Sequence, residues 1–287
     1  MAAPAPITIL YNPNSTGDSR KNARAFKKEL AARGITAELK ATKHAGHAEE
    51  LARAFASDHP RGMVVSSSGD GGYHEVVNGV LGSKNPSVIT GLLPSGNAND
   101  HYHFVHHGDT AARIVRGRSQ HIDVLKVVTP DWTRYAHSYV GLGLTPQIGK
   151  ELTEKRPGRL QEKWLVLKNM FRVTPVQIRV HGRVRNYSHL VLSNSGRMSK
   201  VLTLSTLADI QDGRFEISRV GKDSPFKLLG HLLRATANQI SDTTQADHYS
   251  FTALRNMRIQ LDGEVYTILS GQKVTITCVK QALRTIV

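Results

Sequence analysis

Residues Met63 to Gly79, MVVSSSGDGGYHEVVNG, decide the fold of the first part of the chain. The apolar residues at positions 63–65 predict a short buried strand. Small residues follow from Ser66 to Gly72, and Tyr73 to Asn78 then predicts the start of a helix. A strand, a glycine-rich loop and a helix N-terminus make a place to hold phosphate. Glycine lets the backbone approach an anion, and the free N–H groups and dipole of the helix favour negative charge there.

The loop matches neither of two common phosphate-binding motifs. No Gly-Lys-Ser/Thr closes it, as a Walker A loop requires, and the spacing does not fit the GxGxxG dinucleotide fingerprint. A tight strand-to-helix turn without a ligand is the alternative, because glycine-rich turns are common. Asp70 argues against that alternative, since a carboxylate between two glycines has little packing purpose and could meet a metal, a ribose or a substrate hydroxyl.

Length and composition indicate a globular chain of up to two domains. The chain has 287 residues, of which 39% are hydrophobic, and Cys278 is its single cysteine. An internal disulfide is therefore excluded, and a reducing compartment such as the cytoplasm is expected. No run of about 18 apolar residues predicts a transmembrane helix. The first ten residues, MAAPAPITIL, lack the basic and apolar regions of a secretory signal.

The charge balance favours an anionic partner. Lys and Arg number 38 against 23 Asp and Glu, which gives a formal charge of +15. Such a surface attracts nucleic acid, nucleotides or anionic lipid. The basic residues are spread out and no zinc-finger or RRM signature is visible, so no specific nucleic acid is expected.

Strands and helices alternate up to about residue 130. Strands are predicted at 7–10, 35–41, 63–65, 88–93 and 122–128, and helices at 20–33, 48–57 and 109–116. This alternation predicts a parallel sheet with helices on both faces. A second small-residue loop, Pro94 to Asp100, follows the strand at 88–93. Two such loops on parallel strands form the crevice in which α/β proteins bind ligands.

The pattern changes after residue 130. Segments at 135–143, 176–181, 187–193, 214–220, 257–261 and 274–279 are β-rich and are separated by turn residues, with one predicted helix at 224–239. Successive strands without intervening helices predict an antiparallel β-sandwich. We therefore expect an α/β nucleotide-binding domain at 1–130 and a β-sandwich domain at 131–287.

These motifs resemble the diacylglycerol kinase catalytic family, which includes bacterial diacylglycerol kinases, sphingosine kinases and ceramide kinases. The usual signature is GGDGTxNEVVNG, which the stretch from Ser68 to Gly79 follows. Ser68 replaces the first glycine, Gly72 the threonine and His74 the asparagine; the serine and histidine resemble the sphingosine kinase version. Residues 94–101 are similar to the family pattern PxGTxNDF, with Asn97 at the threonine and His101 at the aromatic position.

The resemblance implies an active site between an α/β domain and a β-sandwich, with ATP and Mg²⁺ as cofactors. The residues that it assigns to the nucleotide are Asn12, Pro13, Asn14, Ser15, Thr16, Thr42, Ser68, Gly69, Asp70, Gly71, Gly72, Tyr73, His74, Glu75, Gly96, Asn97, Asn99 and Asp100. The segment 209–215 is similar to a family loop that holds a structural Mg²⁺ through an aspartate and neighbouring carbonyls. This implies a metal site at Asp209, Asp212 and Arg214.

Leu261-Asp262-Gly263-Glu264 matches the DGE signature of the family. The lipid hydroxyl needs a base within hydrogen-bond reach. Glu264 or Asp262 is the candidate, and Asp70 competes with them. On an extended strand the two carboxylates of the motif would share one face, whereas Asp-Gly also favours a hairpin turn.

The sequence therefore predicts an ATP-dependent lipid kinase that phosphorylates a hydroxyl of diacylglycerol, a sphingoid base or ceramide. An NAD kinase shares a GGDG-type loop and is the first alternative; a catalytically weak lipid- or nucleotide-binding protein is the second. Without a transmembrane anchor, a monomeric or homodimeric enzyme would bind an anionic membrane peripherally and reversibly. The segment Lys150 to Arg172, in which basic residues flank Trp164 and other apolar residues, is the candidate docking surface, with a role in the core as its alternative.

Overall fold

The computed structural model describes residues 6–15, 17–96, 99–105, 108–147, 173–195, 197–198, 202–203, 209–221, 230 and 243–287. The chain divides into two compact units, one made of residues 1–124 and 279–287 and the other of residues 125–278. This division differs from the predicted domains 1–130 and 131–287 mainly at the C-terminus, which returns to the first unit.

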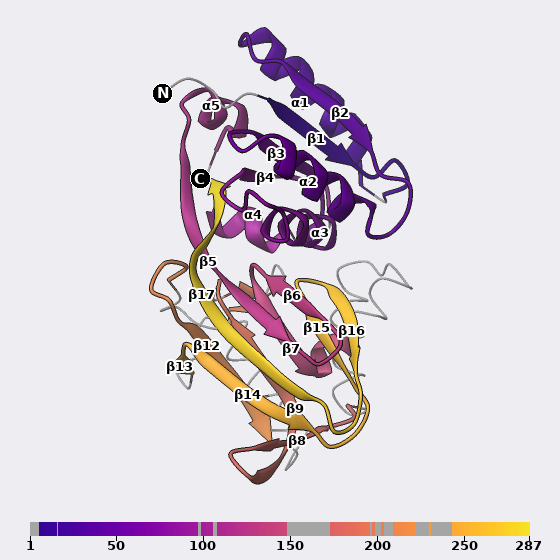
Figure 1. Cartoon of the computed structure of the whole chain (residues 1–287), viewed down its shortest axis with the longest axis vertical. Helices are drawn as coiled ribbons and strands as arrows, with labels where there is room; N and C mark the ends of the chain where they lie inside the picture. Colours follow the sequence, from indigo (N-terminus) through magenta and orange to yellow (C-terminus); the bar gives the residue numbers. More distant parts are fainter. Residues whose placement is uncertain are drawn as a thin grey trace. The chain divides into compact units, whose positions relative to one another are not determined.

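A parallel sheet forms the centre of the first unit, in the order β2-β1-β3-β4. The strands are β1 (Ile7–Tyr11), β2 (Ala37–Ala41), β3 (Met63–Ser68) and β4 (Ile89–Pro94). Ile9 lies opposite Val65, and Val65 lies opposite Gly91. All four strands run in one direction, so their carboxyl ends and the loops that follow them lie at one edge of the sheet (Figure 1).

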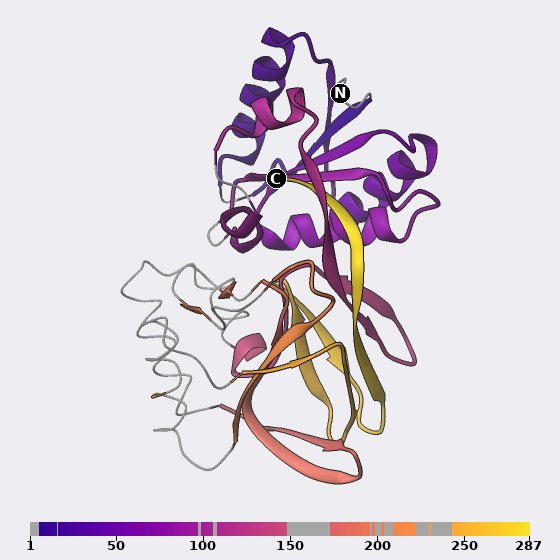
Figure 2. The same cartoon turned by 90° about the vertical axis from the view of Figure 1, so that its left-hand side faces the viewer.

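Helices cover both faces of this sheet, as predicted (Figure 2). They are α1 (Ser19–Ala32), α2 (His47–Asp58), α3 (Asp70–Leu81), α4 (Asp100–Val105) and α5 (Thr110–Val115). Ala23, Phe26 and Leu30 recur at helical spacing on α1 and are buried against the strands together with α5. Helices α2 and α3 pack on each other and on the strands. Within the described ranges, no helix combines the length and apolar character needed to cross a bilayer.

The last strand, β17 (Lys273–Ile286), explains why the C-terminal residues belong to the first unit. Thr285 pairs in parallel with Thr90 of β4, and Ile286 is fully buried in the core of the first unit. A Cβ on Gly91 would lie 2.9 Å from the Cδ1 of Ile286, so this glycine leaves room for the final residues. The β-rich sequence of this segment does not indicate that the strand leaves the core of the second unit and enters that of the first.

The second unit consists of antiparallel strands, as predicted. Besides parts of β5 (Ser119–Val128) and β17, its strands are β6 (Thr133–Ala136), β7 (Tyr139–Gly143), β8 (Val176–Val180), β9 (Arg183–Ser193), β10 (Arg197–Met198), β11 (Leu202–Thr203), β12 (Phe215–Gly221), β13 (Thr244–Ala246), β14 (His248–Ala253), β15 (Met257–Leu261) and β16 (Glu264–Ile268). The main path is β16-β15-β7-β9-β8-β14-β17, and β12 pairs with β9. The helix predicted at 224–239 lies outside the described residues, apart from Gly230.

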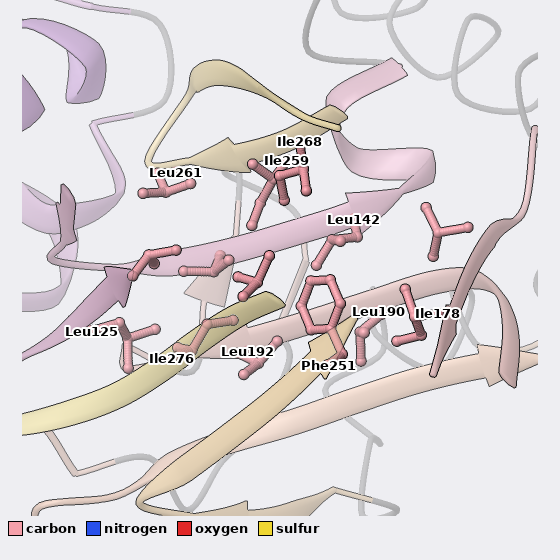
Figure 3. Packing of buried hydrophobic residues seen from close by; sticks show 14 of the residues in the cluster. Leu125, Leu142, Ile178, Leu190, Leu192, Phe251, Ile259, Leu261, Ile268 and Ile276 are labelled. Carbon is pink, nitrogen blue, oxygen red and sulfur yellow. The ribbon is translucent and has the colours of Figure 1, made fainter. Parts of the chain in front are cut away.

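One hydrophobic core fills the second unit (Figure 3). Leu142, Leu190 and Phe251 come from three different strands and are almost fully buried. Ile259 and Leu261 point into the core from alternate positions of β15, which is the two-residue period of a half-buried strand. This core is built without residues of the first unit's cluster, so each unit has its own interior.

An ion pair joins the ends of α1 and α5 on the surface of the first unit. Arg33 donates two hydrogen bonds to the carboxylate of Asp109, at 3.2 and 2.7 Å, and Asp109 also accepts from the N–H of Ala112 as the N-cap of α5. The hydrogen bond from Arg33 is the main cause that lowers the pKa of Asp109 from 3.8 to about 2. A carboxylate with a lowered pKa in the fold stabilises it above the pKa of the unfolded chain.

We expect Asp109→Asn to lower the melting temperature by about 1–2 °C near pH 7, because asparagine keeps the cap but loses the ion pair. The difference should shrink as the pH falls from about 4 toward 2, where the carboxylate of the original protein is itself protonated. Thermal unfolding of both proteins over this pH range measures it. A difference that stays constant with pH would assign the effect to cap geometry instead of charge.

Candidate active site

The glycine-rich stretch forms a strand, a one-residue turn and a helix. Strand β3 ends at Ser68, Gly69 is the extended N-cap, and α3 begins at Asp70. The helix therefore starts three residues earlier than predicted. Gly71 and Gly72 lie in its first turn, where N–H groups have no partner within the helix and stay available to an anion. Asp70 is half-buried at this end, and its carboxylate accepts from the N–H of His101 at 3.4 Å.

The second predicted loop follows β4 and is held by one asparagine. Asn99 has a positive φ of 53°, which few residues other than glycine and asparagine adopt. Its side chain accepts from the N–H of Gly96 at 3.0 Å and donates to the Gly96 carbonyl at 2.9 Å. Asn99 therefore fixes the turn with its own amide. Asn97 and the side chain of Asp100 lie outside the described residues.

The two loops touch backbone to backbone. Ser95 donates its N–H to the carbonyl of Ser68 at 2.9 Å. A Cβ on Gly96 would lie 2.4 Å from the Cα of Gly69, a distance that no real side chain tolerates. Position 96 therefore needs glycine for packing, and a Cβ on Gly69 would be tight at 3.0 Å from the Cα of Gly96. The contact brings the predicted residues Gly69, Asp70, Gly96 and Asn99 into one group.

The loop after β1 joins the same group. Asn12 accepts from the N–H of Asn14 at 2.9 Å, and Ser15 donates its hydroxyl to the carbonyl of Gly17 at 2.9 Å. A Cβ on Gly17 would come 1.9 Å from the carbonyl oxygen of Ser95, so this loop packs against the one that follows β4. The predicted residue Pro13 is exposed beside Asn12, and Thr16 lies outside the described residues.

A set of buried polar side chains beneath these loops was not predicted. The hydroxyl of Ser67 donates to the carbonyl of Ser19 at 2.9 Å, and Ser19 donates back to the carbonyl of Ser67. Asn22 donates to the hydroxyl of Ser95 at 2.9 Å. The unusual run of three serines at the end of β3 was the available signal, since serine at a buried strand end needs hydrogen-bond partners.

Ser68 and Gly72, where this chain departs from the family signature, lie next to each other. A Cβ on Gly72, in the first turn of α3, would lie 2.6 Å from the Cβ of Ser68, the last residue of β3. The Ser68 hydroxyl lies 2.7 Å from that of Ser66. The loop thus carries its hydroxyl at the end of the strand instead of in the first turn of the helix.

Two predicted nucleotide contacts have buried side chains. Tyr73 is fully buried, its hydroxyl lies 2.9 Å from that of Thr90 and 3.1 Å from that of Thr285, and its ring contacts His101. His74 is 1% exposed and its Nε2 lies 3.2 Å from the amide nitrogen of Asn78. These side chains hold α3 in place, so a nucleotide contact by either would have to come from its backbone.

The predicted residues Thr42 and Glu75 lie near the N-terminus of α2: Thr42 precedes this helix in the chain, and Glu75 of α3 contacts its first residues. Thr42 follows β2, is half-buried and donates its N–H to the carbonyl of Tyr11 at 2.9 Å. Glu75 accepts with both carboxylate oxygens from the backbone N–H groups of Gly46 and Ala48, at 2.9 and 3.1 Å. Both oxygens of the Glu75 carboxylate therefore already have hydrogen-bond donors within the protein.

The DGE motif forms the hairpin that the sequence left as the alternative to an extended strand. Leu261 pairs with Glu264, and both Asp262 and Gly263 have positive φ, as in a two-residue type I′ turn. Asp262 is 1% exposed, and its carboxylate accepts from three backbone N–H groups, those of residues 137, 138 and 139, at 2.8–3.1 Å. Glu264 is exposed. The two carboxylates therefore have different environments and do not share one face.

The predicted metal residues lie in a tight turn before β12. Asp209 accepts from the N–H of Gln211 at 2.9 Å and Asp212 from that of Arg214 at 2.8 Å. Nearby Glu216 is almost fully buried, and its Oε2 has no hydrogen-bond partner. Burial raises the pKa of Glu216 to about 6, and the charges of Asp212 and Asp209 add to this. Oxygen donors of this type suit Mg²⁺, but Asp209, Asp212 and Glu216 do not form a group whose carboxylate oxygens all lie within 4.8 Å of one another among the described residues. Arg214 could contribute only its carbonyl, since a guanidinium is not a ligand.

A comparison with protein families gives a match over the part of the chain that contains the three loops. The sequence model of the diacylglycerol kinase catalytic domain matches residues 6–127. Residues 6–127 belong to the diacylglycerol kinase catalytic-domain family. The predicted family is thereby confirmed, and the match includes all three loops of the site.

Individual proteins of this type are similar to nearly the whole chain. The diacylglycerol kinase of Bacillus subtilis (strain 168) is 25% identical over 295 residues, which cover 93% of this chain and 92% of that protein. Crystal structures of a candidate diacylglycerol kinase and of a diacylglycerol kinase from Bacillus anthracis str. Sterne match with TM-scores of 0.76 and 0.71, each at 16% identity. They cover 98% of this chain and 94% and 96% of theirs. The structural matches confirm the two-part fold, and the family supports a kinase of the diacylglycerol kinase type.

We expect Gly96→Ala to weaken ATP binding by about tenfold or more, because the added Cβ forces the loop after β4 away from Gly69. Titration of a fluorescent ATP analogue measures the affinity, and far-UV circular dichroism checks that the variant is folded. If the folded variant binds ATP as tightly as the original protein, the contact between the loops does not shape the nucleotide site.

Proposed function

We propose that this protein is an ATP-dependent lipid kinase that transfers the γ-phosphoryl group of ATP to a hydroxyl of diacylglycerol or a related lipid. The observation that carries the proposal is the contact between the loop Ser68–Gly72 and the described residues Pro94–Gly96 and Asn99, at adjacent strand ends of a diacylglycerol kinase catalytic domain. The N–H groups in the first turn of α3 suit a polyphosphate, and Asp70 adds a carboxylate beside them.

The reaction needs positioning and charge stabilisation more than covalent chemistry by the protein. The lipid oxygen forms a bond to the γ-phosphorus while the bond between that phosphorus and the β,γ-bridging oxygen breaks, and the lipid hydroxyl loses its proton to a base. In this proposal the α3 N-terminus binds phosphate oxygens, and Asp70 orients the nucleotide with its cation. Bound Mg²⁺ would neutralise charge on the phosphates.

Glu264 is the better candidate for the base within the DGE motif. The Asp262 carboxylate already accepts three backbone hydrogen bonds in a buried position, so a substrate hydroxyl would have to compete with them. Glu264 is exposed and one residue beyond the turn. In the proposal Asp262 holds the turn and Glu264 accepts the proton.

We expect Glu264→Gln to lower kcat about a hundredfold while ATP binding stays normal, the usual cost of losing a general base. Asp262→Asn should instead lower the melting temperature, because an amide nitrogen would face backbone donors. Labelled ATP incubated with diacylglycerol, sphingosine or ceramide vesicles, with NAD or with no acceptor, and chromatography of the product give turnover and acceptor together. Label in NADP, or in no product, contradicts the proposal; normal turnover of Glu264→Gln moves the base to Asp70.

We further propose that the enzyme binds anionic bilayers peripherally, since its formal charge is +15 and its substrate is a lipid. The candidate segment Lys150 to Arg172 lies outside the described residues. Changing Lys163, Lys168 and Arg172 to Gln should weaken sedimentation with anionic vesicles, and higher salt should weaken it for the original protein. A matched control changes the exposed α1 residues Arg24, Lys27 and Lys28 to Gln. Equal losses in both triple variants would show that overall charge, not this segment, governs binding.

A further inference from the structure

Glu75 is engaged in a way that its place in the nucleotide signature does not suggest. It lies on α3, five positions after Asp70, and is half-buried. One carboxylate oxygen accepts from Gly46 at 2.9 Å and the other from Ala48 at 3.1 Å. These two donors are the N-cap residue and the second residue of α2. A motif residue of one helix therefore caps the N-terminus of another.

The Glu75 carboxylate lies at the N-terminus of α2, where an external anion could otherwise bind. The first N–H groups of a helix have no partner within it, and the helix dipole favours negative charge beside them. No side chain of the N-cap residue can fill this role, because that residue is Gly46, with a φ of 83°. Glu75 supplies the missing acceptor with a full negative charge. The N-terminus of α2 is thus closed to nucleotide phosphate, whereas that of α3 stays available.

The same contact orders the segment that leads from β2 to α2, residues 42–48. Thr42 at its start donates its N–H to Tyr11 of β1, and Lys43 donates its N–H to the Nδ1 of His47 at 3.0 Å. Glu75 holds the other end of the segment. Helices α2 and α3 also pack closely, since a Cβ on Gly79 would lie 2.4 Å from the carbonyl oxygen of Glu49. The segment is therefore tied at one end to the sheet and at the other to α3, the helix that carries the phosphate loop.

We propose that Glu75 is a positioning residue for nucleotide binding, which acts by fixing the segment 42–48, and with it Thr42, relative to the Ser68–Gly72 loop. It touches backbone and not the nucleotide. This inference rests on the proposed function, because it takes Thr42 as a contact to the nucleotide.

The test is a double-mutant cycle between Glu75→Gln and Thr42→Ala. Glutamine has nearly the same shape but turns an NH₂ group toward one of the two N–H donors, so one hydrogen bond is lost. We expect Glu75→Gln to raise the KM for ATP about tenfold, with kcat and the KM for the lipid changed less than about twofold. If Glu75 acts through Thr42, the double variant should bind ATP no more weakly than Thr42→Ala alone. Glu50→Gln, which removes an exposed carboxylate from the first turn of α2, is the matched control and should leave the KM unchanged.

The outcomes separate this inference from the proposed function. If the original protein shows no ATP binding and no lipid phosphorylation, the proposed function fails. If the original protein is active and Glu75→Gln keeps its KM for ATP, the positioning role is wrong. Additive losses in the double variant, or equal losses of kcat and of affinity for both substrates, would show a general structural role instead. Amide hydrogen exchange that becomes faster at Gly46 and Ala48 in Glu75→Gln, but not in Glu50→Gln, would confirm that the contact exists in solution.

Discussion

The candidate site depends on the contact between Gly69 and Gly96. Parallel strands in one sheet lie about 4.8 Å apart, so the turns that leave β3 and β4 compete for the same space. The turns fit because neither glycine has a Cβ, and the hydrogen bond from Ser95 to Ser68 then fixes them together. Two loops that are separate in the sequence are thus held together beside the first turn of α3, whose N–H groups have no partner within the helix. The same glycines that would admit a phosphate are needed first to let the protein fold there.

The fold was predictable because its signals are local. Apolar runs, helical spacing and turn residues gave the parallel sheet, the helices and the change to antiparallel strands. The return of residues 279–287 to the first unit could not be predicted, because the alternation of side chains along β17 is of the same kind in both units. Only the contacts of Thr285 and Ile286 show that the strand has entered the first unit. The helix start at Asp70 was placed too late because Gly71 and Gly72 were interpreted as loop. In the first turn of a helix, their low propensity costs little beside the packing of Tyr73 and Val76.

The sequence predicted which residues lie at the site, but it predicted less well what each of their side chains does. Sequence order places Ser68, Gly69, Asp70, Gly96 and Asn99 at strand ends, and the topology brings those ends together. It does not show where a side chain points. Tyr73 and His74 lie in the interior of the first unit, and Asn99 binds its own loop. Ser19, Asn22 and Ser95 support the loops from below, and their contacts span up to 73 positions, which no local pattern reports.

Two carboxylates of the predicted site, those of Asp262 and Glu75, are held by backbone hydrogen bonds. Asp262 accepts three and Glu75 two, so both act as fixed anions that hold turns or helix ends. A substrate group would have to displace these hydrogen bonds before it could bind to either carboxylate. Asp70 is half-buried at the first turn of α3, and Glu264 is exposed. In the proposed function, Glu75 and Asp262 therefore hold the backbone, whereas Asp70 and Glu264 meet the nucleotide and the lipid.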